Sequence, residues 1–507
     1  MNSWTDGYVS EIDYTHGFYR ELTPSFLAFC MLLKGLRPPS LAPSFAYCEL
    51  GFGQGFSANL IAAANPWGDF WATDFNPAHA AGAQQLAQAA GTPNVRFFDK
   101  SFTELLETET PTFDLITLHG IYSWISPENR ATIRDFIRCR LRFGGVVYAS
   151  YNCLPGWSPV MPLRQLMIEH AAGSTEPMAA RIDKAIEFAA RLQGLNAGYF
   201  DKNPGVAPRL EGLKGMSRNY LAHEYFNRDW QPQYFAEVAR EMAEAKLVFA
   251  ASVNPADHVD AVNLTTEQQE VLAGVGDPMF RETVRDYFLN QQFRRDVFVK
   301  GAVRLAPQEQ TELLLATRFV LTAPREDIPM KATFARGEVA LQEATYVPVL
   351  DALAKGPATL GQLLAMDGVR EVGLPRLVQA VTVLTATAHA APCLPADGEE
   401  ERAVRARAFN DAVIDRARFS DQLGSLASPV TGGGVTVGRF EQLFLAAMRK
   451  GQDPAKAVWD VLAAQGQRLL KDGKLIEDPE ANLAELRTRA EAFRTKMVPV
   501  LRQLGIR

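Results

Sequence analysis

The sequence predicts an α/β fold in which the first half of the chain forms a parallel β-sheet. Residues 44–153 alternate short apolar runs with longer helical patterns, the order expected of consecutive βα units. A glycine-rich loop follows the first apolar run and precedes a helical stretch, which is typical of sheets that bind nucleotides. At 507 residues the chain is too long for one hydrophobic core, so we expect further domains after the sheet.

The strands of this sheet are expected where aromatic and β-branched residues gather, because these residue types favour strands. The expected strands are Phe45 to Leu50, Phe70 to Thr73, Val95 to Phe98, Phe113 to Leu118 and Val146 to Tyr151. The segments between them, such as Ala78 to Ala90, are rich in alanine and favour helices.

The glycine-rich loop joins the first strand to the helical stretch Phe56 to Ala64. Glycines let the backbone turn sharply and approach a ligand, while the N–H groups of the next helix favour a negatively charged group. The spacing is G-x-G-x-G, whereas the dinucleotide fingerprint places its last glycine one residue later. This favours S-adenosylmethionine over NAD as the cofactor. The residues expected to contact it are Glu49, Gly51, Phe52, Gly53 and Gly55.

Polar and aromatic residues follow the second and third strands and would meet the same ligand. We expect Asp74 to accept both ribose hydroxyls and Asp99 to bond the adenine amino group, with an aromatic ring packed on the base. The neighbours Phe75, Asn76, Ser101 and Phe102 complete this set of expected cofactor contacts. The alternatives are that Asp74 caps a helix and that Asp99 belongs to a turn. Their order after the glycine loop favours the cofactor.

Several segments together resemble bacterial class I methyltransferases that carry a methyltransferase regulatory domain. They are Glu49 to Gly55, Asp74 to Pro77, Asp99 to Phe102, Phe113 to Ser126 and Ser150 to Trp157. A second block, from Tyr220 to Phe226 and on to Phe293 to Phe298, resembles the regulatory region, and the surroundings of Leu426 to Val430 also look familial. The best-known relatives are protein-lysine methyltransferases that modify a rickettsial outer-membrane protein. The resemblance therefore implies a protein substrate with an accessible lysine, whereas a small-molecule substrate and a noncatalytic scaffold that binds S-adenosylmethionine stay open.

The acceptor is expected beside the ends of the fourth and fifth strands. Methyl transfer is an in-line displacement, so the enzyme must mainly align the acceptor with the methyl group in a water-poor cavity. Trp124 and Tyr151 are expected to shape the acceptor slot, with Asn152 beside them. His119 and Gly120 are expected at the cofactor, and the alternative for His119 is that it relays a proton.

The N-terminal segment is rich in aromatic residues and precedes the first strand, a position from which class I enzymes often cover the cofactor. Tyr14 and Tyr19 are therefore expected to contact the cofactor or the acceptor. Packing in the hydrophobic core is an equal alternative for both side chains.

The expected architecture is a Rossmann-like class I methyltransferase sheet with a helical insertion, followed by winged-helix-like and helical C-terminal domains. Residues 1–325 would form the methyltransferase domain, with a helical insertion at 158–230 as a candidate dimerisation element and a regulatory-domain-like region at 218–300. Residues 326–400 would be winged-helix-like and residues 401–507 helical. Two further strands, Lys246 to Val253 and Asp296 to Lys300, would complete the sheet inside the regulatory-domain-like region.

Bulk properties argue against several classes of protein. The formal net charge of −6 and the single basic residue Arg376 within 374–384 make a nucleic-acid partner unexpected. We expect a cytoplasmic protein without membrane insertion, because the sequence contains neither a targeting signal nor an apolar run of about 18 residues. The five cysteines are widely spaced and never form C-x-x-C, so no metal site is expected.

Overall fold

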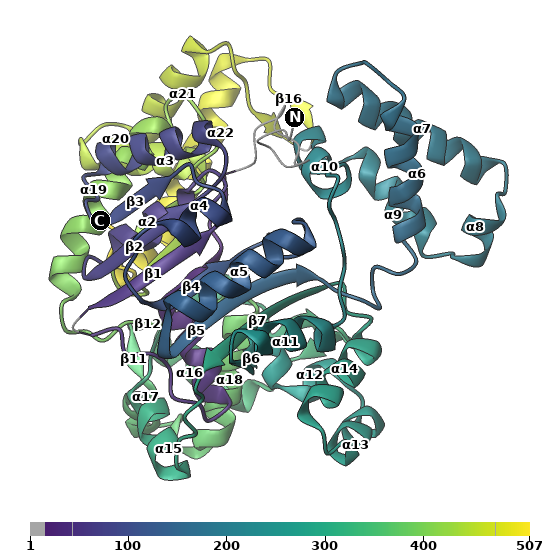
Figure 1. Cartoon of the computed structure of the whole chain (residues 1–507). Helices are drawn as coiled ribbons and strands as arrows, with labels where there is room; N and C mark the ends of the chain where they lie inside the picture. The colour runs from purple at the N-terminus through teal and green to yellow at the C-terminus, as the bar shows by residue number, and fades with distance from the viewer. Residues whose placement is uncertain (1–15, 43, 472) are drawn as a thin grey trace.

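The computed structural model describes residues 16–42, 44–471 and 473–507. A seven-stranded sheet lies at the centre, in the order β3-β2-β1-β4-β5-β7-β6 (Figure 1). Its strands are β1 Phe45–Leu50, β2 Gly68–Thr73, β3 Val95–Phe98, β4 Phe113–Leu118, β5 Leu141–Asn152, β6 Leu247–Ser252 and β7 Phe293–Lys300. The first five strands are parallel, and β7 runs antiparallel between β5 and β6. The predicted fold class is therefore confirmed.

The order of the strands reverses at β1, which pairs with β2 on one side and with β4 on the other. In open α/β sheets, ligands bind beyond the carboxyl ends of the strands at such a switch point. Strand β5 begins five residues earlier than the sequence indicated, and β7 begins three residues earlier, at Phe293. Of these additional residues, Leu141 pairs with Phe113 of β4, and Phe293, Arg294 and Arg295 pair with the last three residues of β5.

Helices cover both faces of the sheet, because alternate residues of each strand point to opposite sides. Tyr47 of β1 belongs to a core shared with α2, while Cys48 belongs to a second core shared with α5. The elements around the sheet are η1 Arg20–Leu22, α1 Pro24–Leu33, α2 Phe56–Ala64, α3 Pro77–Ala90, α4 Phe102–Glu107, α5 Pro127–Arg140 and α11 Phe235–Glu244. The sheet is thus buried on both faces.

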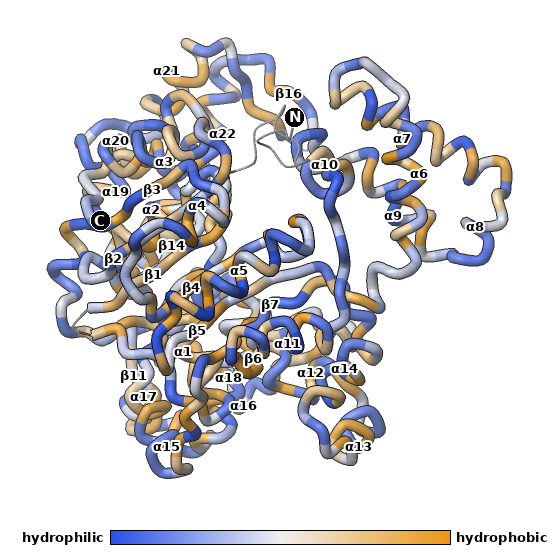
Figure 2. The backbone as a smooth tube through the Cα atoms, in the orientation of Figure 1, coloured by the Kyte–Doolittle hydropathy of each residue, from blue (hydrophilic) through white to orange (hydrophobic). Residues whose placement is uncertain are grey.

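Residues 161–225, within the predicted insertion at 158–230, form a helical arm that extends away from the sheet (Figure 1). Its helices are α6 Met161–Ala172, α7 Met178–Gly194, α8 Gly198–Lys202, α9 Val206–Lys214 and α10 Arg218–Tyr225. The arm has its own hydrophobic core, to which α7 contributes Ile182, Ala185, Ile186 and Ala189 at helical spacing. Hydrophobic and hydrophilic residues alternate along the arm (Figure 2). The arm is therefore a compact unit attached at one end.

Within the regulatory-domain-like region, the chain segment that connects β6 to β7 forms η2 Pro255–His258, α12 Asp260–Asn263, α13 Thr266–Gly274 and α14 Pro278–Leu289. It is followed by α15 Pro307–Ala316, β8 Arg318–Leu321, η3 Arg325–Asp327, β9 Lys331–Phe334, β10 Gly337–Ala340, α16 Glu343–Leu353, β11 Ala358–Thr359, α17 Leu360–Ala365, η4 Arg370–Val372, α18 Leu374–Ala386 and β12 Ala390–Cys393. Helices α16, α17 and α18 pack with a small sheet of order β11-β8-β12 in one core. Since β8 is part of this unit, the unit includes residues upstream of 326.

The C-terminal region consists of α19 Glu399–Arg416, β13 Ser425–Ser428, β14 Gly433–Thr436, α20 Arg439–Arg449, α21 Pro454–Ala464, β15 Leu470–Lys471, β16 Lys474–Leu475, α22 Pro479–Ala492, the π-helical turn η5 Phe493–Met497 and α23 Val498–Gln503. This region shares one core with the central sheet. Phe409 of α19 stacks on Phe56 of α2 at a centroid distance of 6.1 Å. The C-terminal helices therefore support the helix that follows the glycine loop.

Two observations concern the described part of the chain as a whole. None of its helices combines the length and the apolar character needed to cross a membrane. In the same ranges, no cluster of three His, Cys, Asp or Glu side chains is arranged to hold a metal ion.

Candidate active site

A cavity of about 310 Å³ lies at the carboxyl ends of the central strands, beside the glycine loop. Its lining residues come from the N-terminal segment, the loops after β1, β2, β3 and β4, the start of α5, and the connection that follows the arm. Ligand pockets in proteins span about 300–1,000 Å³, so the cavity is large enough for a nucleoside-sized ligand.

The glycine loop has a backbone that only glycine adopts easily. Gly51, Gly53 and Gly55 have φ angles of 75°, 57° and 68°. A Cβ at Gly51 would lie 2.3 Å from Cδ1 of Ile121, and one at Gly55 would lie 2.4 Å from Cβ of Ala83. Within the described ranges no side chain caps the N-terminus of α2, so its first N–H groups suit a carboxylate ligand.

Glu49 lines this cavity and is only 3 % exposed. Burial, with a smaller effect from the nearby Asp74 carboxylate, raises the pKa of its carboxyl to about 8. Its Oε2 atom has no hydrogen-bond partner in the described part of the chain. A buried carboxylate without a partner is costly, so this position suits a cationic ligand group. The ammonium group of S-adenosylmethionine fits this requirement.

Asp74 connects the glycine loop with the start of α3. Its Oδ2 accepts a hydrogen bond from the Gly53 N–H at 2.9 Å, and its Oδ1 accepts one from the Asn76 N–H at 3.0 Å. Nδ1 of His79 lies 3.2 Å from the same Oδ1. Asp74 lines the cavity, as does its neighbour Phe75. Asn76 caps α3 through the Ala78 N–H and does not line the cavity, so the expected contact from its side chain is not supported.

The loop after β3 contributes different residues from those expected first. Asp99 is exposed and does not line the cavity, whereas Ser101 and Phe102 do. Ser101 also forms a capping box with Glu104 at the start of α4, which fixes the backbone here. Ser101 and Phe102, and not Asp99, are therefore the residues of this loop that a ligand in the cavity would meet.

His119 packs against the N-terminal segment at the edge of the cavity. Its ring stacks on Tyr19 at a centroid distance of 3.9 Å, and its Nδ1 lies 2.8 Å from the Tyr148 hydroxyl. Burial, with a smaller effect from Arg295, lowers the pKa of His119 to about 3. The imidazole is therefore neutral near pH 7, which argues against a proton-relay role. The adjacent Gly120 has a φ of 67°, and its N–H donates to the Ser150 hydroxyl at 2.8 Å.

Of the residues expected at the acceptor slot, Trp124 and Tyr19 line the cavity. Tyr151 and Asn152 do not, and both are buried. The reason is that β7 pairs with β5 as far as Asn152, so both residues lie inside the sheet. The expectation that they wall the acceptor slot is not met. Tyr14 lies outside the described residues.

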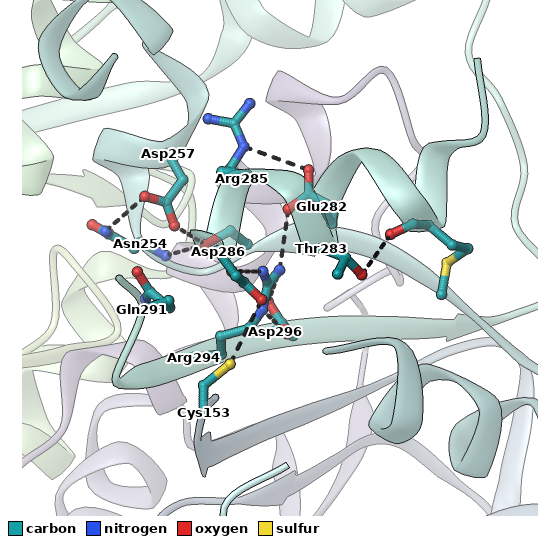
Figure 3. A network of polar contacts seen from close by, with 12 residues as sticks. Cys153, Asn254, Asp257, Glu282, Thr283, Arg285, Asp286, Gln291, Arg294 and Asp296 are labelled. Carbon is teal, nitrogen blue, oxygen red and sulfur yellow. Dashed lines mark hydrogen bonds and ion pairs between the residues drawn. The ribbon is translucent and has the colours of Figure 1, made fainter. Parts of the chain in front are cut away.

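A buried ionic network holds this part of the sheet together (Figure 3). The Arg294 guanidinium donates to Asp286 at 2.6 Å, to Asp296 at 2.8 Å and to Glu282 at 3.1 Å. Burial raises the pKa of Asp286 to about 7, although Arg294 opposes the shift. The network joins α14 to β7, and through the hydroxyl of Tyr151, which donates to Asp296, it reaches β5.

Sequence reasoning missed several lining residues. They are Gly17, Gln54, Phe56, Ser57, His79, Lys100, Thr103, Ile121, Ile125, Ser126, Asn129 and Asp229. Most of them are next to a predicted site residue in the sequence, and this adjacency could have indicated that they line the same cavity. Asp229 follows the arm, and nothing local in the sequence indicates that it returns to this cavity.

Two family models match the chain: a methyltransferase domain at residues 48–145 and a predicted methyltransferase regulatory domain at residues 217–300. An uncharacterized protein of Synechocystis is 46 % identical over 504 residues, covering 99 % of this chain and 100 % of that protein. The chain belongs to this family of methyltransferases. The regulatory domain of this methyltransferase supplies β6 and β7 of the central sheet. The family and the cavity agree on S-adenosylmethionine as the cofactor.

Rickettsial proteins are also similar to this methyltransferase. An uncharacterized protein of Rickettsia prowazekii is 26 % identical over 301 residues, which are 58 % of this chain and 53 % of that protein. The structure of PKMT2 from Rickettsia typhi in complex with AdoHcy covers 97 % of this chain and 99 % of its own, with a TM-score of 0.69 and 16 % identity. At this identity the structural likeness shows a shared fold.

Proposed function

We propose that this methyltransferase transfers the methyl group of S-adenosylmethionine to lysine side chains of a protein substrate. The observation that carries the proposal is the aromatic edge of the cavity, which is lined by Tyr19 and by Trp124 of the loop after β4. The resemblance to rickettsial protein-lysine methyltransferases, seen first in the sequence, supports the same acceptor.

The cofactor would be held by groups from three strand ends. The Glu49 carboxylate would pair with its ammonium group, and the N–H groups at the start of α2 would bind its carboxylate. Asp74 would accept the ribose hydroxyls, and Phe102 would pack on the adenine. When bound, S-adenosylmethionine supplies a methyl group on a positively charged sulfur.

The acceptor amine must lose its proton before it can attack a methyl group. An apolar aromatic surround disfavours the charged form of an amine, so Tyr19 and Trp124 would lower the pKa of an entering lysine. The neutral imidazole of His119 behind Tyr19 adds no positive charge to the site. These residues would also exclude water and orient the amine.

The proposal is tested by incubating the full-length protein with methyl-labelled S-adenosylmethionine and cell lysate. The expected result is label on polypeptides that yield methylated lysine after acid hydrolysis. A Gly51→Ala variant should lose labelling, because its Cβ would clash with Ile121, while Gly82→Ala should retain it because that position is open. Label only in small solutes, or no label at all, would contradict the proposal.

A further inference from the structure

Among the described residues, three carboxylates line the cavity, and the proposed cofactor contacts account for two of them. Glu49 and Asp74 are buried and lie beside the glycine loop. The third, Asp229, comes from the connection at 226–234 that returns from the helical arm to the sheet. Its side chain is 30 % exposed, so it can meet a group that enters from solvent.

The connection that carries Asp229 is fixed against the ends of the central strands. The Gln231 N–H donates to the Ser123 carbonyl at 2.8 Å, and the Gln233 N–H donates to the Asn152 carbonyl at 3.0 Å. The Gln231 side chain also accepts a hydrogen bond from Arg130 of α5 at 2.8 Å. Asp229 is therefore held on the side of the cavity where β4 and β5 end.

Aromatic residues surround this position. Trp230, the next residue, packs on Trp124 with ring centroids 6.0 Å apart and on Trp157 with centroids 5.0 Å apart. Trp124 lines the same cavity as Asp229. A carboxylate together with an indole is a combination that attracts a cation, because the ion pair and the cation–π interaction act on the same charge.

Among the described residues, Asp229 is paired with Arg228, and a substrate could replace this partner. Arg228 donates to Oδ2 of Asp229 at 2.8 Å, but its side chain is 61 % exposed. Ion pairs between exposed side chains contribute little free energy, so an entering ammonium group can compete for the same carboxylate.

We propose that Asp229 is the acceptor-recognition residue, which binds the ammonium group of the lysine side chain as it enters from solvent and thereby selects cationic acceptors. The lysine then releases its proton to water, and the neutral amine moves past Asp229 toward Trp124 and the methyl group. This inference rests on the proposed lysine methylation and adds the group that captures the substrate. It also gives the helical arm a role, because the arm ends in the connection that carries Asp229.

The test compares full-length Asp229→Asn with a matched control, Asp201→Asn, which alters an exposed acid on α8 of the arm. The probe is a pool of peptides that each contain one lysine, with a second pool in which norleucine replaces the lysine. We expect kcat/KM of Asp229→Asn to fall by about tenfold or more on the lysine pool, with KM taking most of the change. The Kd for S-adenosylmethionine, measured by calorimetry, should stay within about twofold. Asp201→Asn should match the wild type.

Salt dependence gives a readout that a merely structural role would not move. Because salt screens the attraction between Asp229 and the lysine, kcat/KM of the wild type should fall as the salt concentration rises. The kcat/KM of Asp229→Asn should depend less steeply on salt concentration. If the wild type methylates the lysine pool and Asp229→Asn does so equally well, the inference is overturned while the proposed function stands. If both pools are labelled equally by the wild type, the proposed function fails, and the inference fails with it.

Discussion

The hydroxyl of Tyr151 donates a 2.6 Å hydrogen bond to Asp296, although the two residues are 145 positions apart in the chain. Tyr151 belongs to β5, which begins inside the methyltransferase-domain match at residues 48–145, and Asp296 belongs to β7 of the regulatory domain. Both side chains are buried. The bond therefore lies within one continuous sheet, and the two regions named by the family models form a single folded unit.

Substituting Tyr151 tests whether it stabilises the sheet or acts in the cavity. Tyr151→Phe removes the donor and leaves Asp296 short of one partner, so we expect the free energy of unfolding to fall by about 1–3 kcal/mol. Denaturant titration measures this change. Calorimetry should give an unchanged Kd for S-adenosylmethionine, because Tyr151 does not line the cavity. Lost methylation with unchanged stability would show instead that Tyr151 acts on the substrate.

Truncation tests whether the regulatory domain is required for folding. A fragment of residues 1–230 lacks β6 and β7 and would expose the edge of β5. Because unpaired strand edges promote aggregation, we expect this fragment to be insoluble. Solubility and circular dichroism check it, and a well-folded 1–230 fragment would disprove the structural role.

The raised pKa of Glu49 predicts a pH effect on cofactor binding. Below about pH 8 the carboxyl is mostly protonated in the free protein, whereas a cationic ligand favours the charged form. The ratio of the Kd of Glu49→Gln to the Kd of the wild type for S-adenosylmethionine should therefore increase about tenfold from pH 6.5 to pH 8. Calorimetry at each pH measures the ratio, in which the ligand's own titration largely cancels. A constant ratio would contradict a direct contact.

The same pKa shift fixes the sign of an effect on stability. The folded state keeps the Glu49 proton up to about pH 8, whereas the unfolded state releases it near the ordinary glutamate pKa of 4.5. The free energy of unfolding should thus decline between these two pH values as pH rises, since the folded state binds more protons there. Glu49→Gln should show a shallower decline in denaturant titrations.

A substitution in the C-terminal hairpin tests its support of the cofactor site. A Cβ at Gly434 of β14 would lie 2.9 Å from Cδ1 of Leu60 in α2. Gly434→Val should lower the free energy of unfolding by about 1–3 kcal/mol and weaken cofactor binding, because α2 follows the glycine loop. Gly82→Ala on α3 is the control, and it should stabilise the helix by up to about 1 kcal/mol. Equal behaviour of the two variants would argue against this support.

The sequence sufficed for the sheet and the glycine loop because their signals are local. The run Phe45–Leu50 followed by closely spaced glycines predicts a strand, a tight turn and a helix from adjacent residues alone, and β6 could be placed in the same way. The fold class and the cofactor followed from these elements.

The remaining features depend on contacts between distant parts of the chain. The local sequence correctly predicts that Tyr151 lies near the end of a strand. Its burial results from the pairing of β5 with β7, which the local sequence does not indicate. Asp229 reaches the cavity only because the arm folds back on itself. The hairpin of β13 and β14 was not predicted. Its glycines are needed because Leu60 and Thr23, which are distant in the sequence, pack closely against them, and the hairpin's own residues do not indicate these contacts.

The position of β7 between β5 and β6 has a consequence for synthesis on the ribosome. The partner of β5 is not complete until residue 300, which is made long after Asn152. At about 5–20 residues per second, roughly 7 to 30 s pass between these two points. During translation the nascent chain therefore displays an open strand edge, and chaperones that shield such edges should associate with it in this interval.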